Sequence, residues 1–229
     1  MVYSLFLTLK QKMDFKELFN FLTELNKNNH KEWMDENRKW YFSVRDNFIA
    51  WLDEMNIRLA QIDPDFSPTP GRKSINRINN NLLYHPNKPV YKDHFGAGLD
   101  IQKGTGDFYV QLGINECFLA GGFYRPQKKN LDSIRAAIDY NGEEFLKILN
   151  KPSFKAMFNG LMLDEKLKTF PKGFSKDHKH IDLLVNKSFA VSYDLTKQEV
   201  LDSEFENKVI EVYKEMLPFR KYLNKAVTV

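Results

Sequence analysis

The sequence predicts an α+β fold in which a mostly antiparallel sheet, formed by the middle of the chain, is packed by long N-terminal and C-terminal helices. Apolar residues recur at helical spacing near both ends of the chain, whereas the middle shows short apolar runs separated by glycine-containing turns. No internal repeat and no long linker divides the 229 residues, so we expect one α+β domain over residues 1–229.

The first expected helix covers residues 14–26. Asp14 followed by Glu17 resembles a capping box, and the apolar residues after it repeat at helical spacing. A second apolar stripe begins after Asn29 and continues until Pro64 ends it. This stripe predicts either one unusually long helix or two helices with a bend between them.

The composition of residues 66–92 differs from that of the chain before them. They hold four prolines and five asparagines but no acidic residue, which excludes a long helix. Two strands are expected next, at 92–101 and 107–116, joined by a glycine-containing turn at 103–106. A third apolar segment, 117–124, completes this part of the predicted sheet.

The second half of the chain predicts further strands with helices before, between and after them. Asparagine and glycine interrupt one helical pattern, and a threonine with a glutamate three residues later predicts the capped start of another. The expected ranges are a helix at 131–149 with a pause at Asn141–Gly142, strands at 161–170 and 188–195, a short helix near 179–187, and a final helix that opens at Thr196 and is bent by Pro218.

Composition excludes several classes of protein. The chain carries 34 Lys+Arg against 30 Asp+Glu, a net charge of +4 that is mild for a dedicated DNA-binding surface. No window approaches the roughly 20 apolar residues that span a bilayer, so no membrane partner is expected. The single cysteine, Cys117, cannot form an intrachain disulfide and favours a reducing, cytoplasmic location. Its apolar surroundings predict a small buried side chain rather than a nucleophile.

The positive surplus is unevenly placed, and the acid-free segment is the strongest candidate for a site. Its five positive charges are Arg72, Lys73, Arg77, Lys88 and Lys92. Without a carboxylate nearby in sequence, such charges need a partner elsewhere in the fold or an anionic ligand. Both interpretations stay open, and the acids of the long helical stripe that offer ion pairs are Asp35, Glu36 and Asp46.

A second basic segment contains Lys166, Lys168, Lys172, Lys176 and Lys179 together with His178 and His180. A turn at Gly173 would let backbone N–H groups face a phosphate. An exposed loop made soluble by lysines predicts the same pattern. Asp177, His178 and His180 supply too few ligands of fixed geometry for a metal site, so neither a metal nor another cofactor is expected.

An ordered set of short phrases extends from about residue 15 to residue 226. The phrases are FLTEL at 21–25, NNHKEW at 28–33, NRKWY at 37–41, RI at 77–78, NKPVYKDHF at 87–95, GFYRP at 122–126 and PKGF at 171–174. Together they resemble a bacterial conserved-hypothetical family, domain of unknown function 2461. The resemblance implies no activity, because the family has none established. The stretch NNNLLY at 79–84 departs from the family pattern, which has two arginines and an aspartate there.

These residues predict a binder of a phosphorylated or otherwise anionic ligand. The expected pocket collects Arg77, Lys88, Lys92, Arg125, Lys168, Lys172 and His178, with Tyr91 and Tyr124 as ring surfaces for a base or sugar. Its ligand would be a phosphorylated small molecule or a nucleic acid, and the sequence does not identify a protein partner.

Two alternatives to simple binding stay open. The first is an enzyme that acts on such a ligand with His94 or His178 as acid or base, although neither histidine has an evident partner carboxylate. Asp93 precedes His94, but adjacent strand residues point to opposite faces, so we do not expect these two to cooperate. The second alternative is an interaction module without a small ligand.

Overall fold

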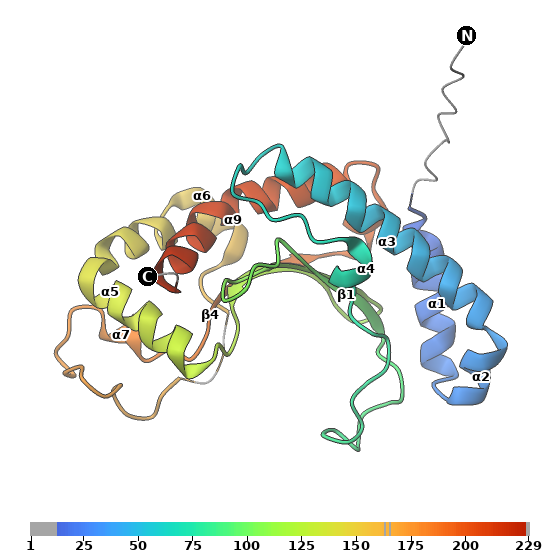
Figure 1. The fold of residues 1–229 in the computed structure, drawn as a ribbon, viewed down its shortest axis with the longest axis horizontal. Helices are drawn as coiled ribbons and strands as arrows, with labels where there is room; N and C mark the ends of the chain where they lie inside the picture. The colour runs from blue at the N-terminus through green and yellow to red at the C-terminus, as the bar shows by residue number, and fades with distance from the viewer. Residues whose placement is uncertain (1–12, 163, 165, 228–229) are drawn as a thin grey trace, which may run out of the picture.

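The computed structural model describes residues 13–162, 164 and 166–227. Its elements are α1 (Phe15–Lys27), α2 (Lys31–Glu36), α3 (Arg38–Ala60), α4 (Gly71–Ser74), β1 (His94–Leu99), β2 (Phe108–Gly113), β3 (Cys117–Phe123), α5 (Lys128–Leu149), α6 (Pro152–Phe158), α7 (Ile181–Leu184), β4 (Phe189–Leu195), α8 (Lys197–Leu201) and α9 (Phe205–Val227). The predicted α+β fold is confirmed, because helices from both ends of the chain pack on one face of a central antiparallel sheet (Figure 1). Within the described residues, no helix combines the length and apolar character that crossing a bilayer requires.

The first helices form in the predicted region. The side chain of Asp14 caps α1 by accepting a hydrogen bond from the backbone three residues ahead, at 3.0 Å. The long apolar stripe forms two helices with the bend at Asn37, the second of the two forms expected. His30 rather than Asn29 caps α2. Asn29 instead exchanges two hydrogen bonds with the backbone of Tyr91, at 3.0 and 2.8 Å, and ties the start of α2 to the acid-free segment.

The sheet has the strand order β1-β2-β3-β4, and every neighbouring pair is antiparallel. Because successive strand residues point to opposite faces, one set of alternate residues faces the helices. These residues are fully or almost fully buried and include Phe95, Ala97, Leu99, Phe108, Val110, Leu112, Leu119 and Val191. The core therefore lies between this face and the layer of α1, α3 and α9 (Figure 1).

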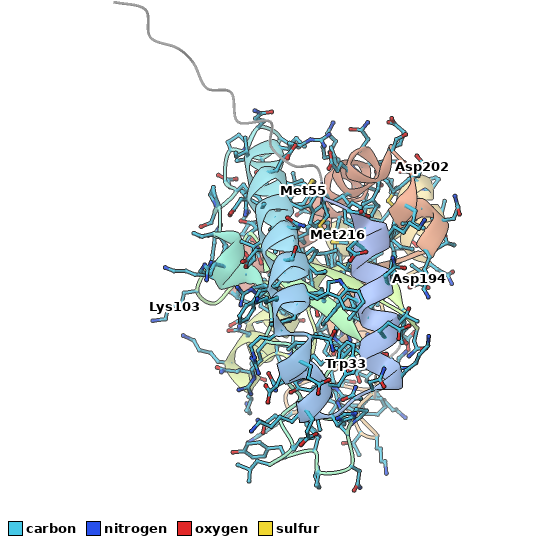
Figure 2. The ribbon with its side chains drawn as sticks, turned by 90° about the vertical axis from the view of Figure 1, so that its right-hand side faces the viewer. Trp33, Met55, Lys103, Asp194, Asp202 and Met216 are labelled. Atoms are coloured by element: carbon cyan, nitrogen blue, oxygen red, sulfur yellow. The ribbon has the colours of Figure 1, made fainter. Side chains whose placement is uncertain are left out.

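Helix α9 lies directly on β3 because two consecutive glycines leave room for it. A Cβ atom at Gly121 would lie 2.4 Å from Sδ of Met216. At Gly122 it would lie 2.4 Å from the carbonyl oxygen of Phe189 and 2.8 Å from Cε1 of Phe219, and Gly122 also has φ +104°. Figure 2 shows Met216 between α1 and α3, in the interior of the molecule. The pair thus acts as a close-packing point between α9 and β3.

A buried ion pair fixes α9 to the hairpin between β1 and β2. The side chain of Arg220 is 1% exposed, and its Nη2 donates to Oδ2 of Asp100 at 2.8 Å and to the carbonyl of Gly106 at 3.0 Å. Asp100 also accepts a hydrogen bond from the backbone N–H of Ser67 at 2.7 Å. Breaking a buried pair by removing one partner typically costs about 3–5 kcal/mol, because the other charge stays buried and uncompensated.

The strand expected at 161–170 is wrong. Of the described residues in that range, Lys166 forms an isolated bridge to Asn186, and the N–H of Met162 donates to the carbonyl of Ala190 at 2.8 Å. The segment runs past the edge of β4 without joining the sheet, because Asp164 is anchored to Arg125 by a 2.9 Å ion pair. Apolar content alone did not distinguish this edge segment from a strand.

The helices near the C-terminus also differ from prediction. The sequence did not predict α6, whose Pro152 occupies the first turn, where the missing N–H costs nothing. The single helix expected after Thr196 is two helices, because Asp202 adopts extended backbone (φ −71°, ψ 148°) between α8 and α9. The predicted capping box of Thr196 with Glu199 is present, and so is the interruption of α5 at Asn141.

The Gly122→Ala change tests the close approach of α9. An L-residue in the left-handed region costs about 1–2 kcal/mol, and overlap with fixed backbone adds roughly 1–3 kcal/mol. Gly104 is the matched control, because it has φ +87° but nothing within 4 Å of its Cβ position. Chemical denaturation should show a larger loss of unfolding free energy for Gly122→Ala than for Gly104→Ala. Equal losses would contradict the packing account.

Candidate functional site

The candidate site lies on the sheet face turned away from α3 and α9, which we call the open face. It consists of the alternate strand residues that do not enter the core, chiefly His94, Gly96, Gly98, Tyr109, Gln111, Phe118, Ala120, Ser192 and Asp194. The sheet is arched, and this face is its concave side (Figure 1). Tyr109, Gln111 and Phe118 are half-buried here, and Asp194 is exposed.

Part of the acid-free segment forms a two-stranded ribbon, residues 78–92, that enters β1 at His94. Asn79 bridges to Tyr91, and the backbone of Asn80 donates to the carbonyl of Val90 at 2.9 Å. In both views the ribbon extends beyond the sheet on the open-face side (Figure 1 and Figure 2). It therefore stands at one end of the open face.

Three cations gather at the base of this ribbon, and we call them the ribbon cations: Arg77, Lys88 and Lys92. Nζ of Lys92 donates to the carbonyl of Arg77 at 2.7 Å. Burial lowers the pKa of Lys92, and the charges of Arg77 and Lys88 lower it further. Among the described residues no carboxylate lies within ion-pair distance of any of the three. The three positive charges repel one another, and no described carboxylate offsets this repulsion. A bound anion would offset it, so the arrangement favours an anionic ligand.

The ion pairs considered as the alternative for these cations are not found in the described part of the chain. Asp35 pairs with Arg38, three residues ahead on the same surface. Asp46 pairs with its neighbour Arg45 at 2.7 Å. Asp35 and Asp46 are therefore engaged locally, and among the described residues Glu36 forms no ion pair with the ribbon cations.

A histidine–carboxylate pair directly follows Lys92 in the chain, contrary to the expectation from strand alternation. Nδ1 of His94 lies 2.9 Å from Oδ1 of Asp93, and the other carboxylate oxygen accepts from Asn115 Nδ2 at 2.6 Å. Alternation does not apply, because β1 begins at His94 and Asp93 precedes it. Burial acts to raise the pKa of Asp93, but hydrogen bonds from His94 and Asn115 outweigh it, so the pKa is lowered. The anionic carboxylate then orients the imidazole ring.

Two glycines of β1 make room for side chains from β2. A Cβ at Gly96 would lie 2.1 Å from the hydroxyl oxygen of Tyr109, and a Cβ at Gly98 would lie 2.5 Å from Oδ2 of Asp107. The Tyr109 hydroxyl also accepts a hydrogen bond from Asn76 at 3.4 Å. Burial raises the pKa of both Tyr109 and Asp107. Sequence reasoning missed these side chains, although the spacing Gly-x-Gly within a strand was a usable signal.

The rings expected to flank the site do not lie where the sequence suggested. Tyr91 is 5% exposed and packs into the core, so its ring surface is not available to a ligand. Tyr124 is exposed, and the guanidinium of Arg125 lies 5.3 Å from its ring centroid. The rings on the open face are Tyr109 and Phe118, with centroids 6.0 Å apart.

The second basic segment stands at the other end of the strands. Arg125 lies two residues after the end of β3, whereas the ribbon leads into the first residue of β1, and these strand ends lie opposite in the register. Strands of six or seven residues span about 20 Å. Lys168 and Lys172 are exposed in the loop below α5. The structure thus brings Arg77, Lys88 and Lys92 together but does not place Arg125, Lys168 and Lys172 with them.

His178 belongs to a separate cluster against α5. Its Nε2 lies 2.8 Å from Oδ1 of Asp139, so it has the partner carboxylate that the sequence did not reveal. His180 is 1% exposed at the side chain and packs on Gly142, where α5 is interrupted; its Nε2 lies 3.5 Å from Oε1 of Glu143. No group of three or more potential ligands within the described residues has a metal-binding arrangement.

The lowered pKa of Lys92 gives a direct test of the cation cluster. Arg77→Gln and Lys88→Gln should each raise the Lys92 pKa toward the ordinary value of about 10.4, but not fully, because burial remains. NMR titration of the Lys92 side chain measures the change. Lys103→Gln, in the exposed β1–β2 turn, is the control and should leave it unaltered. An ordinary Lys92 pKa in the unmodified protein would contradict the cluster.

Comparison with known proteins gave one match. The family described as "Conserved hypothetical protein (DUF2461)" matches residues 17–222. Neither the search of curated proteins nor the search of solved structures returned a match. The expected family is thereby confirmed, and its description attaches no activity to the site.

Proposed function

The chain belongs to the conserved hypothetical family DUF2461, and from the geometry of its site we propose that it binds an anionic, phosphorylated ligand at the base of the ribbon. We also propose that the protein acts in the cytoplasm, because a single cysteine favours a reducing compartment. Cys117 is buried and forms no disulfide. Of the residues expected to form the pocket, Arg77, Lys88 and Lys92 are proposed to bind the ligand. Arg125, Lys168 and Lys172 belong to a separate surface.

One observation carries the proposal: three cations converge without a carboxylate partner among the described residues. The pKa of Lys92 is lowered first by burial and further by the charges of Arg77 and Lys88, so holding Lys92 charged at this position is unfavourable. A phosphate would reverse that cost, because it supplies two negative charges and several acceptor oxygens. Arg77 and Lys88 are exposed, so both reach solvent-borne ligands without rearrangement of the core.

The His94–Asp93 pair favours a second candidate function, an enzyme that acts on the bound ligand. Asp93 fixes Nδ1 of His94 at 2.9 Å, and no described residue forms a hydrogen bond with Nε2 in the structure. A histidine oriented in this way is suited to accept a proton through Nε2. His178 is similarly paired with Asp139 but lies away from the ribbon cations, against α5.

Lys92→Ala should weaken binding of inorganic phosphate about 10- to 100-fold, the range expected for losing one hydrogen bond to a charged group. Isothermal titration at low and moderate salt measures the affinity, which should fall as salt rises. It should also fall as pH rises through the lowered pKa of Lys92, because only the protonated ammonium carries the charge. Lys103→Ala is the matched control. Salt-independent binding, or equal affinity in both variants, would refute the proposal.

His94→Asn separates binding from catalysis. The binding proposal expects phosphate affinity to stay within about twofold, because His94 is not one of the three ribbon cations proposed to bind the phosphate. The enzyme alternative expects slow hydrolysis of a simple phosphoester, p-nitrophenyl phosphate, that disappears in the variant. Turnover that persists in His94→Asn would eliminate His94 as the acid or base, and His178→Asn then tests the other candidate.

A further inference from the structure

We propose that the rings of Tyr109 and Phe118 form the surface on which the planar base of a nucleotide stacks while the ribbon cations hold its phosphate. The inference rests on the proposed function and adds the class of ligand. The same chemistry describes a free nucleotide and one unit of a single-stranded nucleic acid.

The two rings form a continuous aromatic patch on neighbouring strands. Their centroids lie 6.0 Å apart with an interplanar angle of 39°. In the register, Tyr109 pairs with Ala120 and Phe118 with Gln111, so the rings occupy diagonal positions on one face. Both are half-buried, which holds each ring in place while leaving part of it accessible. Fixed aromatic surfaces on open sheets are how several RNA-binding folds hold bases.

Small residues around the rings let the Tyr109 ring lie across β1. Gly96 and Gly98 flank Tyr109 on β1, where any larger side chain would collide with the hydroxyl of Tyr109 or the carboxyl of Asp107. Ala120 lies beside Tyr109 on β3, and Ser192 lies opposite Ala120 on β4. A flat ligand can therefore approach the rings without displacing a bulky neighbour.

A chain of contacts connects the rings to the phosphate site. The Tyr109 hydroxyl accepts a hydrogen bond from Asn76, and Asn76 is the residue before Arg77. The carbonyl of Arg77 in turn accepts from Nζ of Lys92. Asn76 and Arg77 are adjacent, and successive Cα atoms are 3.8 Å apart. The ring surface therefore adjoins the ribbon cations, and together they form one continuous site.

The distribution of charge fixes the direction of the ligand. Asp194 pairs with Phe118 in the register and is exposed, so the β4 side of the rings carries a negative charge. The ribbon cations lie on the β1 side. A phosphate is repelled from the first side and attracted to the second, whereas the uncharged base can lie between them. Amide groups of Gln111 and Asn76 lie near the rings, where they can hydrogen-bond the edge of a base.

The experiment compares inorganic phosphate, ribose 5-phosphate, AMP, dTMP and an eight-residue oligo(dT) on the full chain. AMP and dTMP should bind more tightly than ribose 5-phosphate. Phe118→Ala should remove that advantage, a loss of about 5- to 150-fold for one base–aromatic contact. Phe118→Leu, which keeps the bulk and loses the ring, should do the same. Tyr140→Ala is the control, because its 91% exposed ring lies on α5.

The outcomes separate this inference from the function on which it rests. If phosphate binds, and Lys92→Ala weakens it, but AMP binds no more tightly than ribose 5-phosphate, the base surface is wrong and the anion site stands. If phosphate does not bind, the proposed function fails first. An advantage for AMP that survives both Phe118 variants also overturns the inference. Tighter, salt-sensitive binding of oligo(dT) than of dTMP identifies single-stranded nucleic acid as the source; equal binding identifies the free nucleotide.

Discussion

The direct contact of α9 with β3 is the constraint on which the rest of the fold depends. Because Gly121 and Gly122 have no side chains, Met216 and Phe219 reach the sheet backbone and are fully buried. Each buried side chain of this size contributes roughly 1.5–3 kcal/mol. The buried Asp100–Arg220 pair then fixes α9 along its length. Because α3 and α9 pack on this face, they leave the opposite face uncovered. The candidate site lies on that open face, next to the ribbon.

The asparagine-rich stretch that departs from the family pattern has a structural role in the ribbon. Asn79 bridges to Tyr91, and Asn80 donates through its side chain to the carbonyl of Pro89 at 2.9 Å. Leu83 and Tyr84, at the tip, are 82% and 74% exposed. The asparagines of this stretch therefore hold the two strands of the ribbon together, and Leu83 and Tyr84 form its exposed tip.

Patterns within one element predicted the fold well, and contacts between elements explain the errors. Capping residues and the interruption at Asn141 were readable, because each depends on a few neighbouring residues. The segment 161–170 was misassigned, because a long-range ion pair from Asp164 decides its path. For the site, the absence of acidic residues identified the ribbon cations. Tyr109 and Phe118 were not predicted, because the position of α9 determines which face of the sheet stays uncovered.

Different elements hold the two basic regions of the molecule, the second basic loop and the ribbon. His178 and His180 hold the second basic loop to α5 through Asp139 and Gly142, and α5 itself rests on α9, with Phe145 stacked against Tyr222 at 4.7 Å. The ribbon is carried by β1 instead. The two basic regions therefore rest on different elements, the second basic loop on α5 and the ribbon on β1. A ligand that touched both regions would have to connect these two elements.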